Sequence, residues 1–208
     1  MTEPQGYRAI RQGVVLGAVG DRRQVLVSGP DRQSFLQGFL TNDIAALQPG
    51  TGCYAAWLTP QGRMLADLHV FESGDMALLD VPGQEAEAIA ERLEQFHFAE
   101  QVEIAPPGAL AALWLHGPGT PDLLGSLVHL AGSEPLAAWP NYTNRRAVIG
   151  AEPVVVARCD QLDVPGFVVY VAATALELVS NLLLERGAVP AAPEAIEAAR
   201  IEAGYPLY

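Results

Sequence analysis

The sequence contains no lysine, so all of its basic residues are arginines. This absence excludes Schiff-base catalysis by a lysine amine and any phosphate-binding loop that depends on lysine. Basic residues are also outnumbered, because 12 arginines against 24 acidic residues give a net charge of −12. Since so acidic a chain repels a phosphate backbone, we expect no direct nucleic-acid binding.

Cysteines and long apolar segments are scarce as well. Cys53 and Cys159 lie far apart in apolar, strand-like surroundings, without a CxxC motif. We therefore expect no zinc or iron–sulfur site built by this chain alone.

No apolar run approaches the roughly 18 to 20 residues of a membrane helix, and residues 1–11 lack the pattern of a signal peptide. We expect a soluble, cytoplasmic protein that makes no membrane contact.

Half of the 208 residues are apolar, which is enough to bury a core. Alternating apolar residues predict antiparallel strands at 53–58, 64–71 and 76–81, with residues 59–63 as the hairpin connection between the first two. A helix is predicted over 84–98, where Ala, Glu, Leu and Arg are abundant.

The second half of the chain restarts the pattern of the first. The run 113–118 follows 25–30 at a spacing of 88 residues, and a helical pattern comes after Gly-Pro in both. We interpret this as a duplication, with chance recurrence of a common phrase as the alternative. The expected fold is α+β, with lobes at 1–107 and 108–208 and a ligand cleft between their sheets.

Asp67 is the first candidate for a functional residue. Strand alternation places Leu65, Asp67 and His69 on one face and Ala66 and Leu68 on the other. If that face is covered, the carboxylate must be paired, shifted in pKa or used on a ligand. The alternative is a solvated face on which Asp67 and His69 are ordinary polar residues.

Three further residues are weaker candidates. Tyr54 either stacks on a flat heterocycle or belongs to the core. Arg63, in the hairpin, either reaches an anion or extends into water, and Asn42 either caps the preceding helix or points into the cleft. The four histidines show no ligand spacing, so we predict no metal site.

An ordered series of motifs runs over nearly the whole chain. It comprises Val25–Asp31, Phe35–Gly38, Thr41–Ile44, Pro60–Arg63 with Asp67, Phe98–Pro106 and Arg200–Pro206. This series resembles the YgfZ branch of the YgfZ/GcvT family of folate-binding proteins, which also contains the T-protein of the glycine cleavage system, an aminomethyltransferase. The resemblance implies duplicated ferredoxin-like lobes with antiparallel sheets around a folate channel.

The resemblance also implies roles for single residues. Asp67 falls on the aspartate that the T-protein sets against the reactive folate nitrogen, where it handles a proton or stabilises charge. Tyr54 falls on a channel-lining position, and Asn42 and Arg63 complete the expected binding residues. The implied cofactor is tetrahydrofolate or a related folate.

The sequence departs from the T-protein at three polar positions. Val81, Val168 and Ile196 stand where that protein has a channel asparagine, a pterin-gripping glutamate and an arginine. The chain ends at Tyr208, before the place of the YgfZ signature Lys-Gly-Cys-Tyr-x-Gly-Gln-Glu. We therefore expect a fold that lacks the C-terminal barrel lobe.

The function implied by the resemblance is assistance in assembling or repairing iron–sulfur clusters and, through the enzymes that carry them, in tRNA modification. Its expected partners are a folate and iron–sulfur client proteins. A tetrahydrofolate-dependent aminomethyltransferase is one alternative. A ligand-free scaffold, with Asp67 paired to an arginine such as Arg158 or Arg63, is another.

Overall fold

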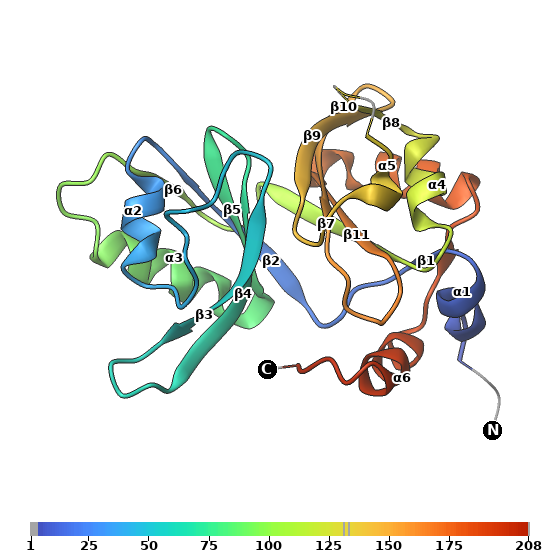
Figure 1. Cartoon of the computed structure of the whole chain (residues 1–208), viewed down its shortest axis with the longest axis horizontal. Coiled ribbons are helices and arrows are strands. Elements are labelled where there is room, and N and C mark those ends of the chain that lie inside the picture. The colour runs from blue at the N-terminus through green and yellow to red at the C-terminus, as the bar shows by residue number, and fades with distance from the viewer. Residues whose placement is uncertain (1–3, 131, 133, 208) are drawn as a thin grey trace. The chain divides into compact units, whose positions relative to one another are not determined.

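The computed structural model describes residues 4–130, 132 and 134–207. Its chain divides into two compact units, each built on its own sheet (Figure 1). The five-stranded unit comprises Asp21–Leu110 and Tyr142–Asn144. The seven-stranded unit contains residues 4–20 and the described parts of 111–141 and 145–207.

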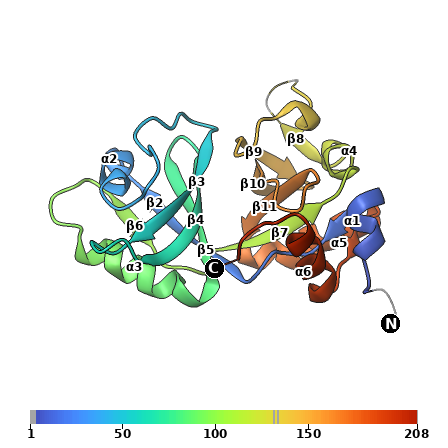
Figure 2. The same ribbon diagram turned by 60° about the horizontal axis from the view of Figure 1, so that its bottom comes forward.

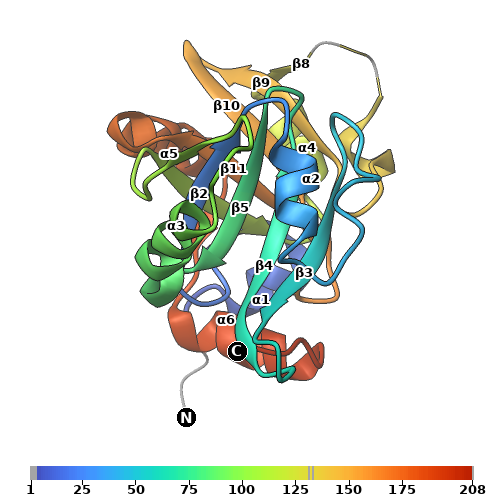
Figure 3. The ribbon, with the colours of Figure 1, turned by 90° about the vertical axis from the view of Figure 1, so that its left-hand side faces the viewer.

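The five-stranded unit has the strand order β3-β4-β5-β2-β6, and all of its neighbouring strands pair antiparallel. Helices α2 and α3 lie over one face of this sheet (Figure 3). Its elements are β2 (Arg22–Ser28), α2 (Arg32–Gln37), β3 (Gly52–Leu58), β4 (Met64–Glu72), β5 (Met76–Pro82), the 3₁₀ turn η1 (Gly83–Glu85), α3 (Ala86–Gln95) and β6 (Glu103–Ala105).

The core of this unit lies between the sheet and the two helices. Ala66, Leu68 and Val70 enter it from β4, and Leu36 and Leu93 enter it from α2 and α3. Because side chains alternate along β4, the residues between the apolar ones face away from this core. The predicted strands at 53–58, 64–71 and 76–81 correspond to β3, β4 and β5.

The seven-stranded unit has the strand order β12-β1-β7-β11-β10-β9-β8. Helices α1 and α6 lie side by side in it (Figure 2). Its elements are α1 (Tyr7–Gln12), β1 (Val15–Leu16), β7 (Leu110–His116), α4 (Thr120–Gly125), β8 (Val128–Leu130), η2 (Leu136–Ala138), β9 (Asn144–Ile149), β10 (Glu152–Arg158), β11 (Gly166–Ala172), η3 (Ala173–Ala175), α5 (Leu176–Glu185), β12 (Val189–Pro190) and α6 (Pro193–Glu202).

The two sheets share a strand order. The series β3-β4-β5-β2-β6 matches β9-β10-β11-β7-β12, except that β1 is inserted between β7 and β12 and β8 extends the other edge. The fold is therefore α+β with a repeated, largely antiparallel plan, as the sequence predicts. Residues 4–20 differ from the expected division at 107/108, because β1 pairs with β7 and β12 and so belongs to the seven-stranded unit.

Candidate functional site

The candidate site lies on the face of the five-stranded sheet that points away from its hydrophobic core. Asp67 and His69 project there from β4, and both are buried, with 6% and 0% of their surfaces exposed. The prediction that they share a face is met, and the alternative of a solvated face is wrong. A buried carboxylate requires partners, because its desolvation is costly.

A row of polar side chains crosses four strands of this sheet. In the strand register, Gln24 of β2 lies opposite Asp80 of β5, Asp80 opposite His69 of β4, and His69 opposite Tyr54 of β3. The Gln24 amide donates to Oδ1 of Asp80 at 2.8 Å, and Nδ1 of His69 lies 3.2 Å from Oδ2 of Asp80. Neighbouring members of the row are thus tied together across the strands.

Arg22 links this row to Asp67. Its Nε donates to Oδ2 of Asp80 at 2.9 Å, and its Nη1 donates to Oδ2 of Asp67 at 3.2 Å. Tyr54 donates its hydroxyl to the same Asp67 oxygen at 3.3 Å. Among the residues that the structure describes, Oδ2 of Asp67 accepts both bonds and Oδ1 accepts none. Oδ1 is the oxygen that remains for a ligand.

Burial and charge set the protonation of the row. Complete burial lowers the pKa of His69, so the imidazole is neutral at neutral pH. Burial alone raises the pKa of Asp80, but the hydrogen bond with His69 and the charge of Arg22 outweigh it and hold that pKa below its ordinary value. The carboxyl groups of Asp67 and Asp80 thus share the single guanidinium of Arg22, and Oδ1 of Asp67 is left to accept a hydrogen bond from a ligand.

Of the other predicted site residues, Tyr54 bonds Asp67, Asn42 bonds backbone beside β3, and Arg63 is exposed. Tyr54 is half-buried and contacts Asp67, as described above. Asn42 is exposed, donates its amide to the Tyr54 carbonyl at 2.9 Å, and accepts from the Asp43 backbone at 2.8 Å. Its side chain therefore shapes the turn beside β3. Arg63 is exposed at the end of the β3–β4 hairpin, and Arg158 pairs with Asp160 at 3.0 Å, so neither is the arginine that binds Asp67.

Sequence reasoning missed Arg22, Gln24 and Asp80. Asp80 gave a signal, since it is an acidic residue inside the apolar run Ala77–Val81. Val81, the position matched to the channel asparagine, belongs to the hydrophobic core on the opposite face of β5. The polar residue on the Asp67 face is therefore its neighbour Asp80.

Aromatic rings surround His69 on this face. Tyr54, Phe71 and Tyr142 place their ring centroids 5.7, 6.4 and 6.1 Å from the imidazole. Phe71 and His69 are completely buried, whereas Tyr54 and Tyr142 are half-buried. The accessible aromatic surface next to Asp67 is thus supplied by the two tyrosines.

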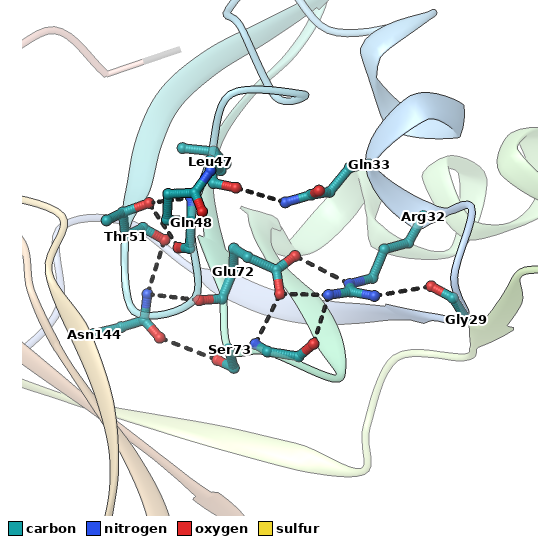
Figure 4. Close-up of polar contacts among 10 residues, drawn as sticks. Gly29, Arg32, Gln33, Leu47, Gln48, Thr51, Glu72, Ser73 and Asn144 are labelled. Atoms are coloured by element: carbon teal, nitrogen blue, oxygen red, sulfur yellow. Dashed lines mark hydrogen bonds and ion pairs between the residues drawn. The ribbon is translucent and has the colours of Figure 1, made fainter.

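A second polar network lies at the end of β4 and includes Asn144 (Figure 4). Arg32 grips Glu72 with two hydrogen bonds, from Nε at 3.0 Å and from Nη2 at 2.7 Å. Asn144 donates to the carbonyls of Thr51 at 2.9 Å and Glu72 at 3.3 Å, and accepts from the Ser73 hydroxyl at 3.1 Å. The network joins α2, β4 and the segment 142–144.

Metal and thiol chemistry find little support in the described part of the chain. No group of three or more His, Cys, Asp or Glu residues is arranged there to hold a metal ion. Burial raises the pKa of the Cys53 thiol to about 11, which keeps it protonated and unreactive at neutral pH.

The helices of the described residues are all too short or too polar to span a membrane.

Comparison with known protein families identifies the family of this chain. The family described as "GCVT N-terminal domain" matches residues 4–208. The chain belongs to this family. The aminomethyltransferase of Thermus thermophilus is 30% identical over 209 residues, which cover 97% of this chain and 57% of that protein. The aminomethyltransferase of Synechococcus sp. is 28% identical over 97% of this chain and 56% of its own length.

Solved structures agree on the fold of this GCVT N-terminal domain. Aminomethyltransferase T of the glycine cleavage system from Bartonella henselae aligns with a TM-score of 0.82 at 20% identity, over 97% of this chain and 54% of that one. A heterotetrameric sarcosine oxidase from Corynebacterium aligns with a TM-score of 0.58 at 15% identity, over 90% of this chain and 85% of that one. The chain spans about half the length of the curated relatives it matches.

Proposed function

We propose that this GCVT N-terminal domain binds tetrahydrofolate or a related folate through Asp67, and that it acts in the manner of YgfZ proteins in the assembly or repair of iron–sulfur clusters. The observation that carries the proposal is the buried Arg22–Asp67–Asp80 cluster. Replacing such a cluster with apolar residues is often neutral or stabilising, so a binding role gives a reason for its presence. Its free carboxylate oxygen, Oδ1 of Asp67, can accept hydrogen bonds from the ring N–H and amino groups of a reduced pterin.

Binding is tested with 5-formyltetrahydrofolate, followed by protein fluorescence and by calorimetry. Asp67→Asn removes the charge that Oδ1 offers, so the affinity should fall about 10- to 100-fold. Asp122→Asn, at an exposed aspartate of α4, is the matched control and should leave the affinity unchanged. No binding by the wild-type protein at millimolar ligand, with the fold intact, would contradict the folate proposal and favour a ligand-free scaffold.

The cellular part of the proposal concerns cytoplasmic iron–sulfur client proteins. Loss of the protein from its source cell should lower the activity of iron–sulfur enzymes, including those that modify tRNA. Wild-type protein should restore that activity and Asp67→Asn should not. Restoration by both would separate the cellular role from the Asp67 site.

Aminomethyl transfer is a second candidate, favoured by the names of the similar proteins. It requires turnover of an aminomethyl donor with tetrahydrofolate. Against it, Val168 and Ile196, at the positions matched to polar T-protein residues, are buried apolar side chains with 0% and 3% of their surfaces exposed. Product formation that Asp67→Asn abolishes would support transfer over cluster maintenance.

A further inference from the structure

Helix α3 and strand β6 lie side by side at one edge of the five-stranded sheet (Figure 1). An open groove of about 410 Å³ runs between them, a volume within the range of protein binding pockets. Ile104 of this groove also belongs to the core on the helix side of the sheet, so the groove lies on the face opposite to Asp67. The lining residues are Ala90, Glu91, Glu94, Gln95, Ile104 and Pro106.

The groove combines an apolar floor with an acidic rim. Ala90 and Ile104 are buried, whereas Glu91 and Glu94 are exposed. A carboxylate oxygen of Glu94 lies 3.6 Å from Nδ1 of His97, and Glu91 has no ion-pair partner among the described residues. Two carboxylates that no arginine neutralises in that part of the chain therefore border an apolar surface.

The loop 96–102 joins the two walls of the groove and presents an exposed aromatic ring. Phe98 is 84% exposed, although its backbone is held firmly. The Glu100 carboxylate accepts from the N–H groups of Phe98 at 3.1 Å and Ala99 at 3.0 Å, and Oδ2 of Asp31 accepts from the Gln101 N–H at 2.7 Å. The ring is thus presented by an ordered turn, which lowers the entropy cost of using it in an interface.

The charge and the edge of the groove restrict what can occupy it. A symmetric dimer through this face would bring two copies of Glu91 and Glu94 into one interface, between chains that each carry a net charge of −12. An added β-strand finds little to pair with, because β6 has three residues and is followed by Pro106 and Pro107, which lack a backbone N–H. A helix with basic residues beside an apolar face fits both the charge and the shape.

We propose that the groove between α3 and β6 is a docking site for a basic amphipathic helix of another protein. An aliphatic side chain of that helix packs on Ile104, and its lysine or arginine side chains pair with Glu91 and Glu94. The Phe98 ring packs against the same helix as an aromatic anchor. The docked helix leaves the Asp67 face of the sheet free, so this inference goes beyond the folate proposal and does not depend on it.

The test uses a fluorescently labelled peptide of about 16 residues, made of Leu, Ala and Lys with Leu at helical spacing, which is long enough to form a helix. Fluorescence anisotropy should show that the wild-type protein binds this basic peptide and does not bind the same peptide with Glu in place of Lys. The double variant Glu91→Arg with Glu94→Arg should bind the basic peptide at least about 10-fold more weakly and should bind the acidic peptide instead. The control variant Glu177→Arg with Glu185→Arg makes the same change of net charge at exposed positions of α5 and should keep the wild-type preference.

The aromatic anchor is tested separately with Phe98→Ser. This variant should bind the basic peptide about 10-fold more weakly and melt at the wild-type temperature, because the ring is exposed in the folded chain. Leu178→Ser, at a 50% exposed leucine of α5, is the control and should bind as the wild type does.

Two results would overturn the inference. Equal losses of affinity in the α3 and α5 double variants would reduce the binding to general attraction by an acidic protein. Failure of the wild-type protein to bind the basic peptide at millimolar concentration would remove the docking site altogether. Either result leaves the folate proposal standing, because Asp67 lies on the other face of the sheet.

Discussion

At the scale of single residues, the buried ion pair of Arg32 and Glu72 differs from a surface ion pair in how much stability is lost when one partner is removed. The side chains are 14% and 1% exposed, and the guanidinium meets the carboxylate through two hydrogen bonds. The side chains of Arg23 and Glu87 also form an ion pair, but they are 39% and 57% exposed. Solvent screening makes such a surface pair nearly neutral for stability.

Arg32→Ala should therefore destabilise the protein by about 3 to 5 kcal/mol, because it leaves the Glu72 carboxylate buried without its cation. The double variant Arg32→Met with Glu72→Gln should lose less, since no buried charge remains. Arg23→Ala, the surface control, should cost under about 1 kcal/mol. Urea unfolding measures all three, and equal losses in Arg32→Ala and Arg23→Ala would contradict the argument.

At the scale of elements, two strand-to-helix turns carry matching glycines. Gly29 after β2 has φ of 100°, and a Cβ there would lie 2.1 Å from the Gln101 carbonyl oxygen. Gly117 after β7 has φ of 127°, and a Cβ there would lie 2.2 Å from the Gly13 carbonyl oxygen. These glycines are 88 residues apart, the spacing of the sequence repeat. The two turns thus repeat in backbone geometry as well as in sequence, because each requires a positive φ and leaves no room for a Cβ atom.

Gly29→Ala and Gly117→Ala should each destabilise the protein by more than about 2 kcal/mol, since the methyl group meets backbone that has to move. Gly125→Ala is the control, because that glycine lies in α4 with no atom within 4 Å of its Cβ position. It should be neutral or stabilise by up to about 1 kcal/mol. Thermal and urea unfolding of the three variants measure the difference, and an unperturbed Gly117→Ala would refute the equivalence of the two turns.

These elements also mark how far the sequence predicts the structure. Strands β3 to β5 follow from alternation, and the face of Asp67 follows with them. The arginine partner of Asp67 does not, because Arg22 lies 45 residues earlier in the chain and is brought near Asp67 by the pairing of β2 with β5. The helix predicted at 84–98 begins as the 3₁₀ turn η1 and ends at Gln95, since local propensity does not fix helix ends.

At the scale of the whole molecule, buried histidines should make the free energy of unfolding fall as the solution becomes acidic. His116 is completely buried, and burial lowers its pKa to about 4. The imidazole of an unfolded chain titrates near its model value of 6.5. Between these two values the unfolded chain binds a proton that the folded chain does not, so the free energy of unfolding falls as the pH drops from about 6.5 to about 4.

The contribution of His116 to this loss should reach at most about 3 kcal/mol, and it should level off below pH 4, where both states are protonated. His116→Phe should remove that part of the pH dependence, while His129→Gln, at an exposed histidine of β8, should retain it. Urea unfolding at several pH values measures the effect. An unchanged slope in His116→Phe would assign the acid sensitivity to other groups, of which His69 is the next candidate because its pKa is also lowered.

The parallel pairing of β1 with β12 has a consequence for the nascent chain. Val15 of β1 pairs with Val189 of β12, so β1 leaves the ribosome 174 residues before this partner is made. At cellular translation speeds this wait is on the order of ten seconds. During it, the five-stranded unit can collapse almost in full, because it lacks only segment 142–144 once Leu110 has emerged. Until β12 is made, β1 has β7 as its one available partner in the sheet, so the other edge of β1 stays unpaired and open to a chaperone.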